Sequence, residues 1–156
     1  MRLTSGALED RIETLVDLLR GDGDVSARHS APEISLVMVD FRVEAPGGRA
    51  GHDMSFRYAE TYEREGGADW VLVEYVYVMA SRTGLGHREY HWHPLRWSGR
   101  EPVYHAHCSE RGSDARLHFR SHRVLLEEAR AEFLRTYAGG HGVNCSDLYP
   151  LARPRT

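Results

Sequence analysis

Hydrophobic positions near the N-terminus repeat with the period of an α-helix. Leu8, Ile12, Leu15 and Leu19 fall on one face of a helix over residues 5–20. Thr4 or Ser5 precedes the pattern and suits an N-terminal cap, and "GDGDVS" at 21–26 ends it.

A second helical pattern closes the folded part of the chain. It predicts a helix over residues 122–137 with Ser121 as its cap. The expected buried stripe consists of Leu126, Ala129, Phe133 and Tyr137.

Between these helices the pattern is that of strands. Five segments rich in branched and aromatic residues are separated by short polar turns, at 33–43, 53–63, 70–80, 87–97 and 101–108. In the second, Met54, Phe56 and Tyr58 alternate with Ser55 and Arg57, which indicates one buried and one solvated face. The third is apolar on nearly both faces apart from Glu74, so we expect a central strand covered on both sides.

Sequential strands with short connections usually pair in antiparallel fashion. We therefore expect an α+β fold, a single antiparallel β-meander of about five strands with an N-terminal and a C-terminal helix packed on one face. Residues 1–137 would form a single α+β domain, and residues 138–156 an irregular C-terminal tail.

Composition adds a few constraints. There is no apolar run long enough to span a membrane and no apolar leader at the N-terminus, so we expect a cytoplasmic protein. In that compartment Cys108 and Cys145 would be free rather than bridged. The net charge is −3, but residues 1–80 carry 8 arginines and 15 acidic residues, whereas residues 81–156 carry 12 and 8. The second half could therefore attract a polyanion.

The stretch "EYHWHPLRWSGREPVYHAHC" at 89–108 holds four of the ten histidines as two His-x-His pairs. If the last two strands form a hairpin that turns at Gly99, His93 faces His105 and His91 faces His107. All four side chains then share one face, because strand side chains alternate with period two.

Three interpretations of this cluster remain open. Converging neutral imidazoles could bind zinc, iron or nickel, although no companion carboxylate is apparent and Cys108 should point away from His107. Histidines could also supply the acid and the base of a metal-free ribonuclease, with Arg96 or Arg100 stabilising the phosphorane charge. In a flat ladder Arg96 faces away, so that role needs a bulge near Pro94. Finally, the histidines could be ordinary strand residues.

Three short motifs in this region carry a resemblance to a known family. "YHWH" at 90–93, "LRW" at 95–97 and "YHAH" at 104–107 resemble elements of the TumE-like proteins, putative toxins of bacterial toxin–antitoxin pairs. The likeness covers roughly residues 8–135 in element order. It matches His91, Arg96, His105 and His107 to the family pattern, whereas Ser98-Gly99 replaces an Asp-Asn pair of the family.

The resemblance implies a toxin, and with the residues above it favours a metal-independent ribonuclease that needs no cofactor. Its partners would be RNA and a cognate antitoxin protein, with no membrane. The expected catalytic residues are His91, His105, His107 and Arg96, and the expected substrate-binding residues are His93, Arg100 and Tyr104. The alternatives are a histidine-rich metal-binding β-sheet protein and a non-catalytic interaction module, and the charge asymmetry would also suit a homodimer.

Overall fold

The structure is a computed structural model, and it describes residues 1–22, 24–29, 36–45, 54–65, 69–81, 86–93, 104–110, 112, 117–139, 143–146 and 149–150. Along the chain these form β1 (Arg2–Thr4), α1 (Ser5–Arg20), β2 (Asp24–His29), β3 (Leu36–Ala45), β4 (Met54–Glu65), β5 (Asp69–Ser81), β6 (His87–Trp92), β7 (Tyr104–Ser109), β8 (Leu117–Arg120), α2 (Leu126–Gly139) and β9 (Tyr149–Pro150).

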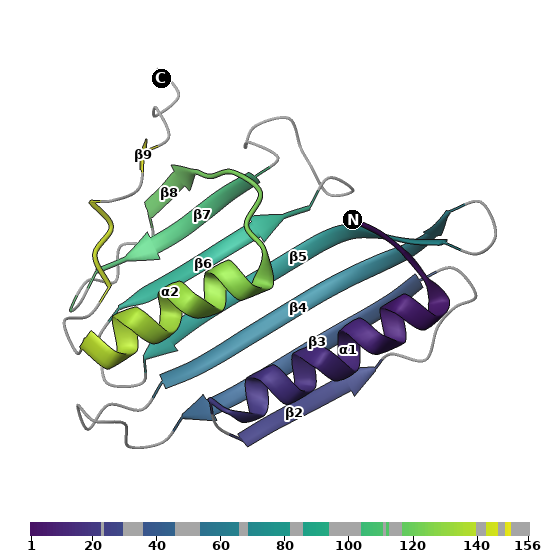
Figure 1. Cartoon of the computed structure of the whole chain (residues 1–156). Coiled ribbons are helices and arrows are strands. Elements are labelled where there is room, and N and C mark those ends of the chain that lie inside the picture. Colours follow the sequence, from purple (N-terminus) through teal and green to yellow (C-terminus); the bar gives the residue numbers. More distant parts are fainter. Residues whose placement is uncertain are drawn as a thin grey trace.

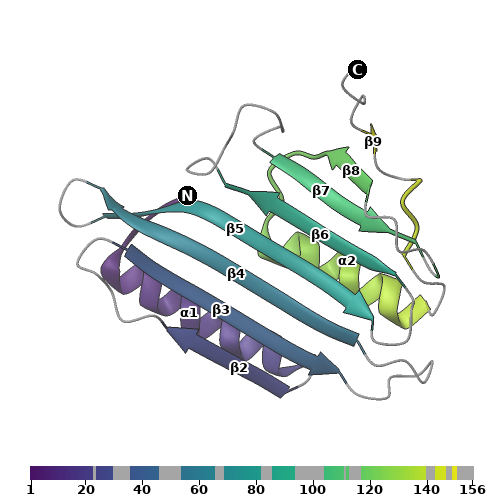
Figure 2. The same cartoon turned by 180° about the vertical axis from the view of Figure 1, so that it is seen from behind.

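The strands form one antiparallel sheet. Hydrogen-bonded neighbours follow the order β2-β3-β4-β5-β6-β7-β8-β9, and β1 pairs with β5. Both helices lie on the same face (Figure 1), and the view from behind shows the opposite face with no described helix over it (Figure 2). We call the first the helix face and the second the open face. The predicted α+β meander is confirmed.

Four strands were not predicted from the sequence, namely β1, β2, β8 and β9. β2 and β8 are short and polar, as "DVSARH" and "LHFR". β2 is hydrogen-bonded to β3 and β8 to β7. Such short strands depend on pairing with a neighbour, so their own sequences carry only a weak strand pattern.

The first helix forms where its pattern predicts. Leu8, Leu15 and Leu19 are buried, and the Ala7 N–H donates to Thr4 Oγ1 at 3.2 Å as the N-terminal cap. At the other end Asp22 accepts two hydrogen bonds from Arg130 of α2, at 2.5 and 2.6 Å. The two helices are thus tied to each other as well as to the sheet.

The second helix begins later than predicted. It starts at Leu126, where the Leu125 N–H donates to Glu128 Oε2 at 2.8 Å, which is one of the two hydrogen bonds of a capping box. The Val124 N–H donates to the hydroxyl of Tyr75 at 2.8 Å, two residues before the helix begins. Ser121 therefore does not cap the helix, and its hydroxyl donates to the His122 carbonyl instead.

The core lies between the sheet and the two helices. Phe133 of α2 is fully buried, and its ring packs 6.1–6.2 Å from those of Phe56, Tyr58 and Tyr90. On β5, Tyr75 and the alternate aromatic and methionine positions are buried on the helix face, whereas Val76 and its neighbours on the open face are only half-buried. The expected central position of this strand is confirmed, but its second face is only partly covered, because both helices pack on the first.

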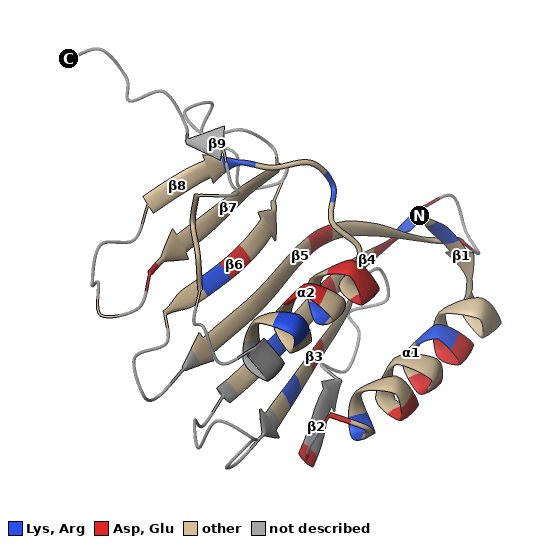
Figure 3. Ribbon diagram, turned by 60° about the vertical axis from the view of Figure 1, so that its left-hand side comes forward, with Lys and Arg blue, Asp and Glu red and all other residues tan. Residues whose placement is uncertain are grey.

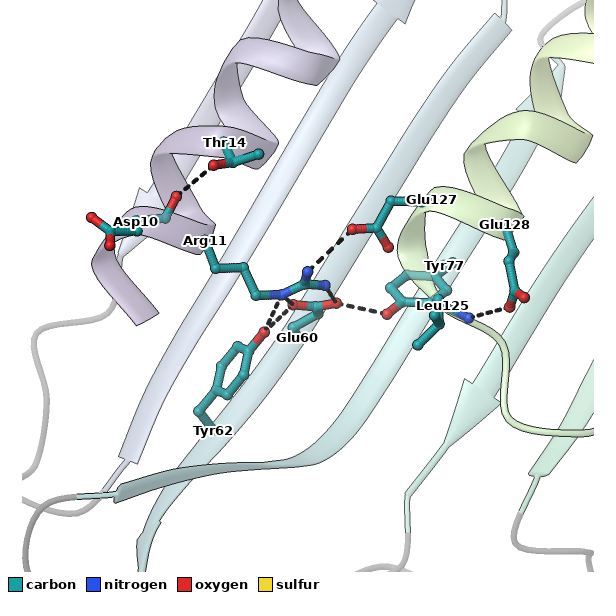
Figure 4. A network of polar contacts seen from close by, with 9 residues as sticks. All are labelled: Asp10, Arg11, Thr14, Glu60, Tyr62, Tyr77, Leu125, Glu127 and Glu128. Atoms are coloured by element: carbon teal, nitrogen blue, oxygen red, sulfur yellow. Dashed lines mark hydrogen bonds and ion pairs between the residues drawn. The ribbon is translucent and has the colours of Figure 1, made fainter. Parts of the chain in front are cut away.

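A polar network crosses the helix face (Figure 4). Glu60 of β4 is 1% exposed, and its carboxylate accepts hydrogen bonds from Arg11 of α1 at 2.9 Å and from the Tyr77 hydroxyl at 2.7 Å. The Tyr62 hydroxyl also donates to Glu60, and Arg11 forms a second ion pair, with Glu127 of α2, at 3.1 Å. Arg11 therefore joins both helices to the middle of the sheet.

A disulfide links Cys108 of β7 to Cys145, and the prediction of free thiols was wrong. Cys108 is fully buried on the helix face, and the segment after α2 passes close enough to meet it. Arg88 of β6 reinforces this attachment by donating to the Asn144 carbonyl. Disulfides are typical of oxidising compartments, so the expected cytoplasmic location stays a prediction that the bridge does not support.

Charged residues are spread over the fold rather than gathered on one element. Figure 3 shows acidic and basic positions on both helices, and an adjacent basic and acidic pair on β6. Among the described helices, none is long and apolar enough to cross a membrane.

Candidate functional site

A cluster of histidines around one carboxylate occupies the open face. Alternation along β6 places His87, Glu89 and His91 on that side, while Arg88 and Tyr90 point to the helix face and bind Glu132 of α2. β7 adds His105 and His107 to this face, and β8 adds His118, which lies opposite His107.

The register of the β6–β7 hairpin differs from the predicted one by two residues. His91 lies opposite His105, and Glu89 lies opposite His107. A shift of two residues preserves the face on which each side chain lies, so the cluster survives although the predicted pairs do not.

Two packing features accompany this register. On the helix face it sets the large Tyr90 against the small Ala106. At the start of β6, Gly86 has a φ of +105°, and a Cβ there would lie 2.5 Å from the Ser109 carbonyl oxygen. Glycine at this position therefore allows the two strands to meet in this alignment.

Glu89 is the centre of the cluster and is 7% exposed. Its Oε1 lies 2.6 Å from His91 Nε2, and its Oε2 lies 2.9 Å from His87 Nε2 and 3.5 Å from His107 Nδ1. No companion carboxylate was predicted from the sequence. The available signal was simple, since Glu89 precedes His91 by two residues on the same strand.

The imidazole rings pack closely against one another. The ring of His91 lies 4.7 Å from that of His107, 4.9 Å from that of His93 and 5.2 Å from that of His105. His118 of β8 is exposed and stacks on His107 at 4.2 Å. His105 is 2% exposed and His91 is 9% exposed, so the centre of the cluster is removed from solvent.

Electrostatics keep Glu89 charged and His91 neutral. Burial alone would raise the pKa of Glu89, but the imidazoles of His107, His87 and His91 outweigh it and hold that pKa far below its usual range. Burial lowers the pKa of His91, and its attraction to Glu89 only partly offsets this. A carboxylate beside a neutral imidazole is the combination that a metal ion requires.

Among the residues that the structure describes, two sets of side chains are arranged so that each could hold a metal ion. The ligand atoms of Glu89, His91 and His107 all lie within 4.8 Å of one another, and so do those of His91, His93 and His105. Both ring nitrogens of His91 and of His107 are buried and make no hydrogen bond. The close approach of His91 Nε2 to Glu89 does not have hydrogen-bond geometry, so these nitrogens are poorly satisfied by the protein itself.

The structure brings together four of the residues expected at the site, namely His91, His93, His105 and His107. Tyr104 is not among them, because it lies on the other face of β7 and stacks on Trp92 at 5.6 Å. Arg96 and Arg100 lie outside the described residues, together with Pro94 and Gly99. The phosphate-binding role of Arg96 and the bulge that it requires stay predictions.

Two further residues adjoin the cluster. Glu74 of β5, noted in the sequence as an isolated polar residue, lies 3.4 Å from His93 Nδ1. Arg120 of β8 is the cross-strand partner of His105 and is exposed. Arg120 was not predicted, because β8 is short and was not predicted as a strand.

No protein-family model matches the chain, and neither a curated protein nor a solved structure is significantly similar to it. The resemblance to TumE-like proteins therefore stays a prediction.

Proposed function

We propose that this protein binds a divalent transition-metal ion through Glu89, His91 and His107. The observation that carries the proposal is the convergence of a carboxylate and two imidazoles, with all ligand atoms within 4.8 Å of one another. For ligands about 2.0–2.1 Å from a tetrahedral ion, neighbouring ligand atoms are about 3.4 Å apart. Small side-chain rotations would therefore suffice to close the site.

Burial supports this role. A buried polar atom without a partner costs about 1–3 kcal/mol, and His91 and His107 both carry such nitrogens. An ion would satisfy them and would neutralise the carboxylate that they surround. A purely structural cluster would gain more from apolar residues of the same size.

The donor set also limits the chemistry. Two imidazoles and one carboxylate suit zinc, iron(II), cobalt(II) or nickel(II), and a three-ligand set leaves a position for water or a substrate. His87 would act through Glu89, because its 2.9 Å hydrogen bond orients that carboxylate. Such a centre would supply Lewis-acid chemistry.

The test is metal binding by purified protein, measured by calorimetry with Zn²⁺ and by absorption with Co²⁺. We expect His107→Gln to weaken Zn²⁺ binding by at least about 100-fold, since even changes outside the ligand sphere cost about 10–100-fold. His122→Gln is the matched control, because His122 is exposed and lies outside the cluster. Absence of Zn²⁺ binding by the wild type, or equal binding by both variants, would contradict the proposal.

Metal-free RNA cleavage is a second candidate, and Arg120 favours it. This arginine is the cross-strand partner of His105 and could contact a phosphate beside an imidazole that donates or accepts a proton. In that case the protein, freed of any antitoxin partner, would cleave RNA in the presence of EDTA to a 2′,3′-cyclic phosphate. His105→Gln and Arg120→Gln would each abolish cleavage, whereas EDTA-sensitive cleavage would assign the activity to a metal centre.

A further inference from the structure

The two ligand sets have one residue in common. His91 belongs both to the set with Glu89 and His107 and to the set with His93 and His105. From this we infer that the cluster holds two divalent ions that share His91, one in each set. The inference rests on the proposed metal-binding function and extends it from a mononuclear to a binuclear centre.

His91 is placed to serve two ions because both of its ring nitrogens are available. Its Nε2 lies 2.6 Å from Glu89 Oε1, on the side of the first set, and its Nδ1 is also buried and makes no hydrogen bond. The rings of His107, His93 and His105 all lie 4.7–5.2 Å from that of His91. His91 is thus surrounded by the ligands of both sets.

The second set has its own support. His93 Nδ1 lies 3.4 Å from Glu74 Oε1, so a carboxylate stands next to this ligand as Glu89 stands next to His91. His105 is 2% exposed, so its imidazole is shielded from solvent. Two ions would bring four positive charges, which the carboxylates of Glu89 and Glu74 would partly compensate.

Sharing one imidazole requires a proton to leave. Neutral imidazole carries one N–H, and each nitrogen can donate its lone pair to an ion only after that proton is released to solvent. The bridged state is therefore an imidazolate with one ion on Nδ1 and one on Nε2. Binding of the second ion should release a proton from His91, in addition to protons displaced from the other ligands.

The experiment titrates the metal-free protein with Zn²⁺ to count ions and with Cu²⁺ to detect bridging by electron paramagnetic resonance. We expect two equivalents per wild-type chain. The Cu²⁺ signal of the first equivalent should shrink as the second is added, because an imidazolate bridge couples the two spins. His93→Gln should bind one equivalent and keep its full signal, and His122→Gln should behave as the wild type does.

The outcomes separate this inference from the proposed function. One equivalent in the wild type, unchanged by His93→Gln and lost in His107→Gln, would overturn the second ion while leaving the first site in place. Two equivalents whose signals simply add would overturn the sharing of His91. Absence of binding would overturn both proposals. Circular dichroism on each variant checks that it is folded, and His93→Asn provides a second variant if the glutamine fails.

Discussion

The Arg11–Glu60 ion pair offers the sharpest test of how the helices are held on the sheet. Glu60 is 1% exposed, and its Oε1 lies 2.9 Å from Nη2 of Arg11. Burial alone would lower the pKa of Arg11, but Glu60 outweighs it and the pKa lies above its usual value. Replacement of Arg11 by methionine keeps the packing of the stem and removes the charge, so it leaves a buried carboxylate without its cation.

The expected loss in the free energy of unfolding of Arg11→Met is large. Removing one partner of a buried ion pair costs about 3–5 kcal/mol, because the remaining charge is not compensated. The hydroxyls of Tyr62 and Tyr77 still donate to Glu60, which favours the lower end of that range. For a domain of this size, 1 kcal/mol corresponds to about 2–4 °C in Tm, so Arg11→Met should lower Tm by about 6–12 °C.

Urea unfolding followed by circular dichroism measures the effect, in a double-mutant cycle with Glu60→Gln. The double variant should be less destabilised than the sum of the two single variants, because it leaves no unpaired charge. Arg20→Met is the control, since Arg20 pairs with Asp17 on the surface, where both side chains are mostly exposed, and should lose less than about 1 kcal/mol. Equal losses in Arg11→Met and Arg20→Met, or strict additivity in the cycle, would refute the reasoning.

Three further predictions concern the disulfide, the buried Tyr75 hydroxyl and the core residue Phe133. The disulfide closes a separation of 37 residues, so Cys145→Ser should lower the free energy of unfolding by about 4 kcal/mol, and reductant should weaken the wild type but not the variant. Burial raises the pKa of Tyr75 to about 12, whereas an unfolded tyrosine titrates near about pH 10. The Tyr75 hydroxyl of the folded state therefore keeps its proton to a higher pH than that of the unfolded state, so the free energy of unfolding should fall as the pH rises above about 10. The tyrosinate absorbance near 295 nm should accordingly rise at a higher pH in folded than in denatured protein. Finally, Phe133→Ala should cost about 3–5 kcal/mol in urea unfolding, while Leu125→Ala, at a side chain that is 42% exposed, should cost less than about 1 kcal/mol. The first argument fails if reductant changes the stability of Cys145→Ser. The second fails if the tyrosines of the folded protein titrate together with those of denatured protein. The third fails if Phe133→Ala and Leu125→Ala lose equal stability.

Local patterns were enough for most of the elements. The apolar spacing of α1 fixes both its bounds and its buried face, and the alternation of Phe56, Arg57 and Tyr58 matches the burial along β4. The start of α2 was misplaced, because it depends on the Tyr75 hydroxyl, which is distant in sequence. The disulfide was missed for the same reason, since no local pattern places Cys145 beside β7.

For the candidate site, the sequence by itself determined that the histidines of β6 and of β7 each lie on one side of their strand, because side chains alternate with period two whatever the register. Only the tertiary structure decided which residues meet. It set Glu89 opposite His107, brought β8 with His118 and Arg120 against β7, and buried His91 among its neighbours. These are matters of register and strand pairing, which depend on contacts between residues distant in sequence and not on the pattern of one strand alone.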